Sequence, residues 1–464
     1  MKKISCIIVF AFICLAVQAQ DSVKKWTLEE CIQYAIAHNI SIKQIAIQKD
    51  NAEIELNTAK MSRLPNLNAG VGQRWNFGRS NNTPTGVYEN QTMSNTSLSI
   101  SSNTSLFTGF KIQNQIEGSK LQLEAAIQSL EKAKEDLSLN IASLFLQALF
   151  NKEILKVSEE QLELSQSQVK RTELLVETGK VPVSQLYDIK AQVAKDEVTV
   201  IESANNLKLS LLDLAQSLEL ERDLGFDITV PELDDVVENN IKSILPPENI
   251  YDNAVNFKPQ IKEQEFLVKS AEKSLKIAQS GYYPSLSLDL GYGNSYYYNY
   301  SMEGRSISSP TQSDPDRTIT WNNDSFSDQL KNNGGEYIGL SLSIPIFNRF
   351  SVRNQVRSAR LSINNQQLAL DNAKKTLFKE IQTAYLNATS SQSKYHSSVK
   401  AVEASQESFK YAQERYEIGK ISVYEFNEAK TRLVQSQSEQ IQAKYDFIFR
   451  SKILDFYNGI PITL

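Results

Sequence analysis

Apolar residues recur at every second position in two parts of the chain and follow a helical spacing in most of the remainder. The clearest alternation lies at 286–292 and at 338–346, where Leu, Ile and Tyr are separated by Ser, Gly, Asp and Pro. A less regular alternation lies at 67–77 and again at 98–106. Period two over about ten residues predicts a strand with one apolar face, so the sequence predicts four strands.

The four strands are expected in two hairpins that lie far apart in the sequence. The first hairpin is predicted at about 66–107 with its loop at about 78–94, and the second at about 285–347 with its loop at about 295–336. The polar faces of the strands carry small residues, which is typical of a barrel in lipid with its apolar side outward. Alternation alone also fits a soluble sheet that is packed on one face.

Long helices are expected after each hairpin. Residues 111–178 contain no proline, and in the later part of this segment apolar residues step by seven, at Leu155, Leu162, Val169 and Val176. A repeat of seven residues is typical of a left-handed coiled coil. We therefore predict long helices over about 111–221 and about 351–457, and shorter helices ahead of each hairpin, the first of which starts at Thr27.

The whole plan occurs twice in the chain. Residues 35–72 resemble residues 254–291 at an offset of 219, and after an insertion of 21 residues the match resumes at an offset of 240. We divide the chain into a first repeat at 20–221, a linker at 222–250 and a second repeat at 251–464.

The first 19 residues have the features of a secretory signal. Lys2 and Lys3 precede an apolar run that ends at Val17-Gln18-Ala19. At about eleven residues the run is too short for a membrane anchor, which needs about 20. We predict that residues 1–19 are removed on export. The mature chain then keeps Cys31 alone of the three cysteines, and loss of two lysines changes its formal charge from −5 to −7.

The expected assembly follows from the number of strands. No later apolar run approaches the length of a transmembrane helix, so a mature chain that crosses a membrane must do so as a closed β-barrel. Four strands cannot close a pore in one chain, and closure therefore requires several copies. The predicted fold class is mainly α, with duplicated long helical hairpins and a contribution of four strands to a transmembrane β-barrel.

The inventory of reactive side chains argues against an enzyme. The two histidines, His38 and His396, lie in different repeats in helical context, and the chain has no metal-ligand spacing, phosphate loop or nucleophile motif. No cofactor is therefore expected. The modest acidic excess, without a basic block, also gives no electrostatic support for binding nucleic acid.

The repeated plan resembles the TolC-like outer-membrane efflux protein family. The matching features are a Pro-x-Leu at each first strand (Pro65 and Pro284), a Phe-x-x-Phe after each second strand (Phe107 and Phe347), and the segment from Tyr416 to Ala429. The resemblance covers essentially the whole mature chain, and it rests on the order of these features in both halves.

The resemblance implies a homotrimer in the outer membrane of a Gram-negative bacterium. Three protomers would form a barrel of twelve strands in outer-membrane lipid and an α-helical barrel that extends into the periplasm. The channel would be the passive exit duct of a tripartite efflux or type I secretion system, driven by an inner-membrane pump through a periplasmic adaptor. The alternative is a periplasmic coiled-coil protein such as the adaptor itself. Drugs, metals and proteins all remain possible substrates.

The resemblance also implies a gate at the helix tips. The family's acidic ring maps to Glu425 and Glu428, which lie three residues apart and so on one helix face. Threefold symmetry would gather six carboxylates, raise their pKa values and let them bind a blocking cation, without a permanent metal site. The family's tyrosine latch maps to Tyr416, but its acidic partner is Gln185 here and a family arginine is replaced by Ile421.

Docking of an adaptor is expected at the two matching helix-to-helix turns. Gly179 and Lys180 in the first repeat correspond to Gly419 and Lys420 in the second. Glycine permits the left-handed backbone that commonly ends a helix. We predict that these four residues mark the periplasmic tips.

Overall fold

The computed structural model describes residues 25–82, 86–220, 225–231, 245–308 and 312–463. The predicted signal peptide and much of the predicted linker lie outside these residues. The chain splits into a helical unit and a sheet unit, and each contains segments from both halves of the sequence. The helical unit consists of Met1–Asp50, Glu124–Glu265 and Leu368–Leu464, and the sheet unit of Asn51–Leu123 and Phe266–Gln367.

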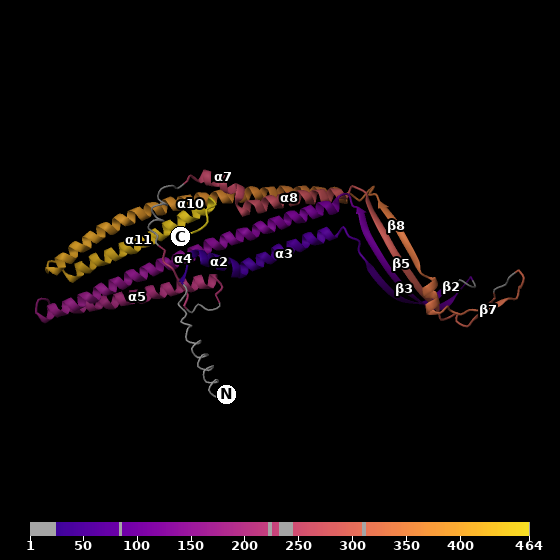
Figure 1. The fold of residues 1–464 in the computed structure, drawn as a ribbon, viewed down its shortest axis with the longest axis horizontal. Coiled ribbons are helices and arrows are strands. Elements are labelled where there is room, and N and C mark those ends of the chain that lie inside the picture. Colours follow the sequence, from indigo (N-terminus) through magenta and orange to yellow (C-terminus); the bar gives the residue numbers. More distant parts are fainter. Residues whose placement is uncertain (1–24, 83–85, 221–224, 232–244, 309–311, 464) are drawn as a thin grey trace, which may run out of the picture. The chain divides into compact units, whose positions relative to one another are not determined.

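The internal repeat is visible in the helices (Figure 1). Corresponding helices have the same number of residues, 11, 22, 67 and 35. The first two pairs are separated by 219 residues and the last two by 240, which are the offsets of the sequence repeat. The pairs are α2 (Leu28–His38) with α7 (Pro247–Phe257), α3 (Ile40–Met61) with α8 (Pro259–Ser280), α4 (Lys111–Glu177) with α10 (Ser351–Glu417), and α5 (Val183–Ser217) with α11 (Val423–Tyr457).

The helical unit has an apolar core to which α2, α4, α5 and α11 all contribute. Its fully buried members include Cys31, Phe145, Leu149, Leu214 and Phe447. A short parallel pair of strands, β1 (Lys25–Trp26) and β4 (Asp227–Ile228), packs beside this core. None of the helices in the described segments has an apolar stretch long enough to cross a membrane.

Helix α2 begins where the sequence predicts it, and a capping box explains why. The Thr27 hydroxyl accepts a hydrogen bond from the Glu30 backbone N–H at 3.2 Å, and the Glu30 carboxylate accepts one from the Thr27 N–H at 3.1 Å. Reciprocal capping satisfies two backbone donors that have no partner within the helix. The cap fixes the point at which the chain leaves β1 and enters the core.

The sheet unit contains an antiparallel sheet in the order β2-β3-β5-β8. Its register confirms the predicted alternation, because residues directly opposite each other in antiparallel strands share a face. The strands are β2 (Asn68–Asn82), β3 (Val87–Phe107), β5 (Ser285–Asn299) and β8 (Gly335–Ser343). One face carries the pairs Val71–Leu98, Ile100–Tyr292 and Leu290–Ile338, and the other carries Gly72–Ser97, Ser99–Gly293 and Asp289–Gly339.

The predicted loops of the hairpins are wrong in extent. Strands β2 and β3 continue through most of 78–94, and their last pair is Asn82 with Val87. Backbone hydrogen bonds do not depend on apolar side chains, so a polar strand pair continues where the period of two can no longer be recognised. In the second loop β5 runs on to Asn299, and the structure adds β6 (Ser306–Ser308), β7 (Thr318–Thr320) and the short helix α9 (Phe326–Asn332).

Amide side chains hold helix α9 on β5, and the buried Gln329 makes two of these hydrogen bonds. The Gln329 Nε2 donates to the Tyr297 carbonyl at 2.8 Å, and the Tyr297 backbone N–H donates to Gln329 Oε1 at 2.9 Å. The amide of Gln329 thus pairs with the backbone of β5 as a neighbouring strand would. The α9 segment of the second hairpin's longer loop is therefore folded onto the sheet.

Leu340 and Ser341 provide a test of which face meets lipid, because they are neighbours in β8 on opposite faces. Leu340 is 68% exposed in the single chain. We expect Leu340→Arg to destabilise the protein folded in lipid vesicles by about 2–4 kcal/mol if the residue lies near the bilayer midplane. Ser341→Arg should cost much less, because its side chain would point away from lipid. Equal losses in the two variants would contradict the assignment of the faces.

Candidate functional site

The two helix-to-helix turns have the same backbone structure. Gly179 has a φ of 69° and Gly419 a φ of 71°, both in the left-handed region. The N–H of Gly179 donates to the Val176 carbonyl and that of Lys180 to the Leu175 carbonyl, each at 2.9 Å, and the second turn repeats this pattern. These two bonds form a Schellman motif, which ends a helix and satisfies its last carbonyls. Lys180 and Lys420 follow the glycines and are exposed.

The turns differ in how the next helix begins. Pro182 precedes α5 without a side-chain cap, whereas Ser422 precedes α11 with a capping box. The Ser422 hydroxyl accepts from the Glu425 N–H at 3.3 Å, and the Glu425 carboxylate accepts from the Ser422 N–H at 2.8 Å. These hydrogen bonds to Ser422 lower the pKa of Glu425 below its ordinary value. In the single chain the pKa of Glu425 is thus lowered, whereas a ring of carboxylates was expected to raise it.

The other predicted gate residues have local partners. The Glu428 carboxylate lies 2.9 Å from the Arg432 guanidinium one turn later, and both side chains are exposed. The Tyr416 ring stacks on the buried Phe426 ring, with centroids 4.8 Å apart. The Gln185 backbone N–H donates to the Pro182 carbonyl at 3.1 Å. In the part of the chain that the structure describes, no hydrogen bond joins Tyr416 to Gln185.

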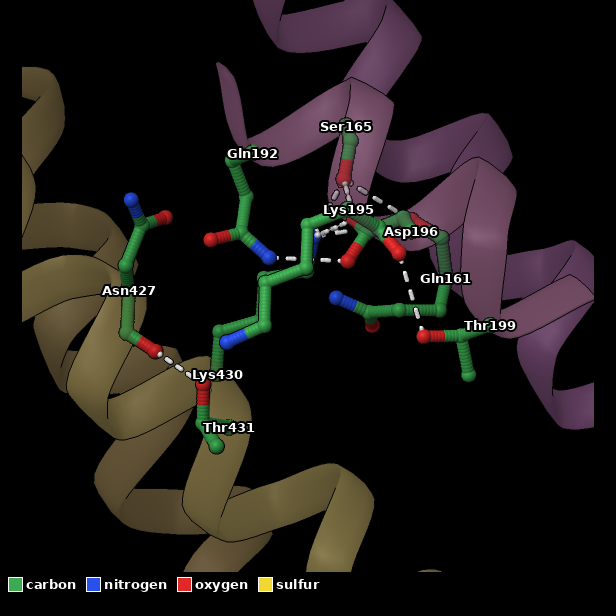
Figure 2. A network of polar contacts seen from close by, with 9 residues as sticks. All are labelled: Gln161, Ser165, Gln192, Lys195, Asp196, Thr199, Asn427, Lys430 and Thr431. Atoms are coloured by element: carbon green, nitrogen blue, oxygen red, sulfur yellow. Dashed lines mark hydrogen bonds and ion pairs between the residues drawn. The ribbon is translucent and has the colours of Figure 1, made fainter. Parts of the chain in front are cut away.

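A buried charge pair that was not predicted from the sequence lies beyond the tips (Figure 2). Lys430 Nζ on α11 lies 3.1 Å from Asp196 Oδ2 on α5, and the two side chains are only 3% and 10% exposed. Ser165 on α4 donates to the same Asp196 oxygen and accepts from Lys430, while Gln192 Nε2 donates to Asp196 Oδ1 at 2.8 Å. Lys430 therefore reaches across to the hairpin formed by α4 and α5.

The burial of Lys430 has a consequence for its charge. Removal from water lowers the pKa of its ammonium group, and the neighbouring Asp196 carboxylate acts in the opposite direction. The sequence holds one signal of this site. Asp196 lies seven residues after Ile189 and seven before Ser203, so it stands in a buried heptad stripe where a charge requires a partner.

A second ion pair joins the two hairpins nearer the tips. Arg171 Nη1 on α4 lies 3.1 Å from Glu417 Oε1 on α10, and both side chains are partly exposed. An exposed pair of this kind contributes little stability, about 0–1 kcal/mol. The pair is relevant here because it joins the same two hairpins as Lys430.

Another buried lysine lies at the opposite end of α11. Lys258 Nζ is 3.1 Å from Glu135 Oε2 and 3.4 Å from the centroid of the Phe456 ring. Burial lowers the pKa of Lys258 and raises that of Glu135. A cavity of about 350 Å³ adjoins the pair and is lined by further acids, including Glu263 and Glu380. Among the described residues, no group of His, Cys, Asp and Glu is arranged to hold a metal ion.

Comparison with known proteins identifies the family to which this architecture belongs. The family model described as "Outer membrane efflux protein" matches residues 31–219 and 250–452, which is most of the chain. The chain belongs to the outer membrane efflux protein family. The family is one of transport channels, and the predicted fold class, function and outer-membrane location agree with it.

Known relatives of this outer membrane efflux protein are distant in sequence but share its fold. It is 23% identical to the outer membrane protein TolC of Escherichia coli over 429 residues, or 91% of this chain and 80% of TolC. Among solved structures, that of CusC has a TM-score of 0.73 at 16% identity and covers 94% of this chain and 92% of the other. The outer-membrane channel CmeC of Campylobacter jejuni gives 0.71 at 17% identity, with coverage of 93% and 86%.

The buried pair predicts an asymmetry between single and double variants. Asp196→Ala leaves the Lys430 ammonium buried without a counter-charge, and should lower the free energy of unfolding by about 3–5 kcal/mol. Replacing both partners, with Asp196→Leu and Lys430→Met, should cost far less because no charge is left buried. Chemical unfolding of the full protein, followed by circular dichroism, measures both. A double variant as unstable as Asp196→Ala would show that the pair is not coupled.

Proposed function

We propose that three copies of this chain form an outer-membrane exit duct for a tripartite efflux or type I secretion system. Residues 1–19 would be removed on export. Each copy would contribute its four strands to a closed barrel of twelve strands in outer-membrane lipid. The observation that carries the proposal is an apolar sheet face whose large side chains are exposed in the single chain, such as Val71 at 78% and Ile338 at 75%.

The edges of the sheet support assembly from several copies. In the described residues β2 and β8 each pair on one side only. An unpaired edge presents backbone donors and acceptors that have no partner within lipid, where each such group costs several kcal/mol. Pairing β8 of one copy with β2 of the next satisfies both edges, and repeating the step closes a ring. Rotational symmetry then places identical tips around one axis.

The tips support a gate that selects by charge. Glu425 and Glu428 lie on one exposed face at the start of α11, and threefold symmetry would bring six carboxylates toward the axis. Such a ring attracts cations and repels anions. Ser422 keeps Glu425 ionised by hydrogen bonding to the carboxylate. Tyr416 and Gln185 would lie in the same constriction, where Tyr416 would hold the second hairpin turn through its contact with Phe426.

The exposed turns support docking of a periplasmic adaptor. Open space surrounds Gly179 and Gly419, since a Cβ added to either would meet nothing within 4 Å. Lys180 and Lys420 add a positive charge to each turn. The adaptor would bind these turns and connect the duct to an inner-membrane pump, which would supply the energy for transport. Transport through the duct itself would be passive and would need no cofactor, and nucleic acid is not a proposed partner.

The number of copies tests the proposal directly. We expect the full protein in detergent to have the native mass of three chains and to lose this mass on boiling, because the barrel is closed only by pairing between copies. Native mass spectrometry measures the mass, and heat-dependent migration on a denaturing gel reports the dissociation. A monomer that retains its full strand content would rule out the proposed barrel.

The gate is tested by removing charge without changing shape. Glu425→Gln with Glu428→Gln should reduce selectivity for cations and weaken block by divalent or trivalent cations, while the trimer remains intact. Single-channel recordings in planar bilayers measure both properties. Unchanged selectivity and block would mean that both residues are ordinary solvated helix residues.

The Ser422 cap adds a dependence on pH. The hydrogen bonds from Ser422 lower the pKa of Glu425, so the carboxylate stays ionised above that pKa and is lost only as the pH falls through it. Acidification should therefore mimic the double variant. Ser422→Ala removes the hydroxyl and should shift the loss of cation selectivity to higher pH. Identical pH profiles for the wild type and Ser422→Ala would contradict this role of the cap.

A further inference from the structure

The Lys430 cluster joins two parts of the chain that correspond to each other in the internal repeat. Lys430 comes from the hairpin of α10 and α11, and its acceptors Ser165 and Asp196 come from the hairpin of α4 and α5. The cluster therefore has a donor half on the second hairpin and an acceptor half on the first. In a chain built from two equivalent hairpins, each half has a counterpart at an offset of 240 residues.

The counterpart of the acceptor half is already assembled. Ser165 corresponds to Ser405 and Asp196 corresponds to Ser436. The Ser436 hydroxyl donates to the Ser405 hydroxyl at 2.8 Å, in the place of the hydrogen bond between Ser165 and Asp196. The same contact between the two helices is thus present in the second hairpin, but a hydroxyl has replaced the acid.

The counterpart of the donor half is exposed. Lys430 corresponds to Lys190 on α5. The Lys190 ammonium group lies 2.9 Å from Glu173 on α4 of its own hairpin, and its side chain is 48% exposed. Lys430, by contrast, is buried against the other hairpin. Within a single chain, a donor half can meet an acceptor half only once, in the contact of Lys430 with Ser165 and Asp196. The second hairpin occupies one side of the first hairpin, and the same chain has no further hairpin for the other side.

A second copy of the chain supplies the missing neighbour. This step rests on the proposed trimer, in which first and second hairpins alternate around the axis. We propose that Lys190 of one copy docks onto the Ser405–Ser436 pair of the next copy, and that this contact between copies is the weaker of the two kinds of joint in the ring. The next copy would offer Lys190 only hydroxyls, and its one opposite charge would be Glu173 of its own hairpin, whereas Lys430 finds an opposite charge across the joint in Asp196.

A second ion pair within one copy also has counterparts in the repeat that cannot form an ion pair. The ion pair between Arg171 and Glu417 also joins the two hairpins of one copy. Its counterparts are Tyr411 and Glu177, which are both exposed and cannot form an ion pair with each other. At two positions, then, opposite charges are kept within a copy and are not kept between copies. The joints between copies are consequently the ones that part first when the tips separate.

Cross-linking tests where Lys190 docks. In a Cys31→Ala background, Lys190→Cys with Ser405→Cys should give cross-links between copies with a short bismaleimide, seen as dimers and trimers on a denaturing gel. Lys430→Cys with Ser165→Cys should cross-link only within a copy. Lys208→Cys with Ser405→Cys is the matched control, since Lys208 is exposed farther along α5, and it should give no product. Trimers in which the Lys190 pair links no copies would overturn the inference.

Restoring the acid tests the strength of the joint. Ser436→Asp should slow dissociation of the trimer by at least about tenfold, as expected for a hydrogen bond to a charged partner, and should lower channel conductance. Ser436→Asn, which has the same shape without the charge, should have little effect, and adding Lys190→Gln to Ser436→Asp should cancel the gain. A gain that persists without Lys190, or no gain at all, would overturn the inference. Absence of any trimer in the wild type would instead refute the proposed function itself.

Discussion

Backbone hydrogen bonding at the two edges of a narrow sheet is the constraint on which the rest of this molecule depends. Within the described residues, strands β2 and β8 each pair on one side, and all four strands contribute large apolar side chains to one face of the sheet. Neither property is stable for a single chain, because water cannot solvate the apolar face well and lipid cannot satisfy the edges. Identical neighbours would pair the edges, and lipid would then cover the apolar face. The duplicated helices then have to fit a closed ring, which explains why corresponding helices have equal lengths.

The contacts between the two helices of the first hairpin are polar where an ordinary coiled coil would be apolar. Serines occupy buried positions at regular intervals along α4, at Ser158 and Ser165, and Asp196 and Ser203 face them from α5. Small hydroxyls allow close packing of helices, and each bond is weak enough to be exchanged for another. In the proposed channel, such contacts would let the helical wall hold its shape and still open at one end. Lys430 adds a buried charged contact that is costly to break.

Much of the architecture could be predicted from the sequence, because it depends on periodicity and repetition. The offsets of 219 and 240, the apolar parity of the strands and the ends of α4 and α10 all follow from patterns that a single chain displays. The ends of β2 and β3 could not be predicted, since Asn and Ser residues there pair through their backbones alone. The cap role of Glu425 was overlooked although Ser422 and Glu425 have the Ser-x-x-Glu spacing of a capping box.

The buried cluster was missed for a different reason. A lysine and an aspartate in polar helices look like solvent-exposed residues until the helices are placed side by side. Asp196 and Lys430 are separated by 234 residues, so no local pattern links them. Their counterparts in the repeat, Ser436 and Lys190, show that the two halves of the chain have diverged at this position while keeping the same backbone.

The 21 residues that distinguish the two hairpins were inserted without altering any helix. The difference between the offsets is confined to the segment between β5 and β8, where Gln329 fastens the added chain to the sheet. This segment can therefore vary in length and surface while the helices on either side of it keep their lengths. Substitutions and insertions here can accumulate without disturbing the matched lengths on which pairing of the two repeats depends.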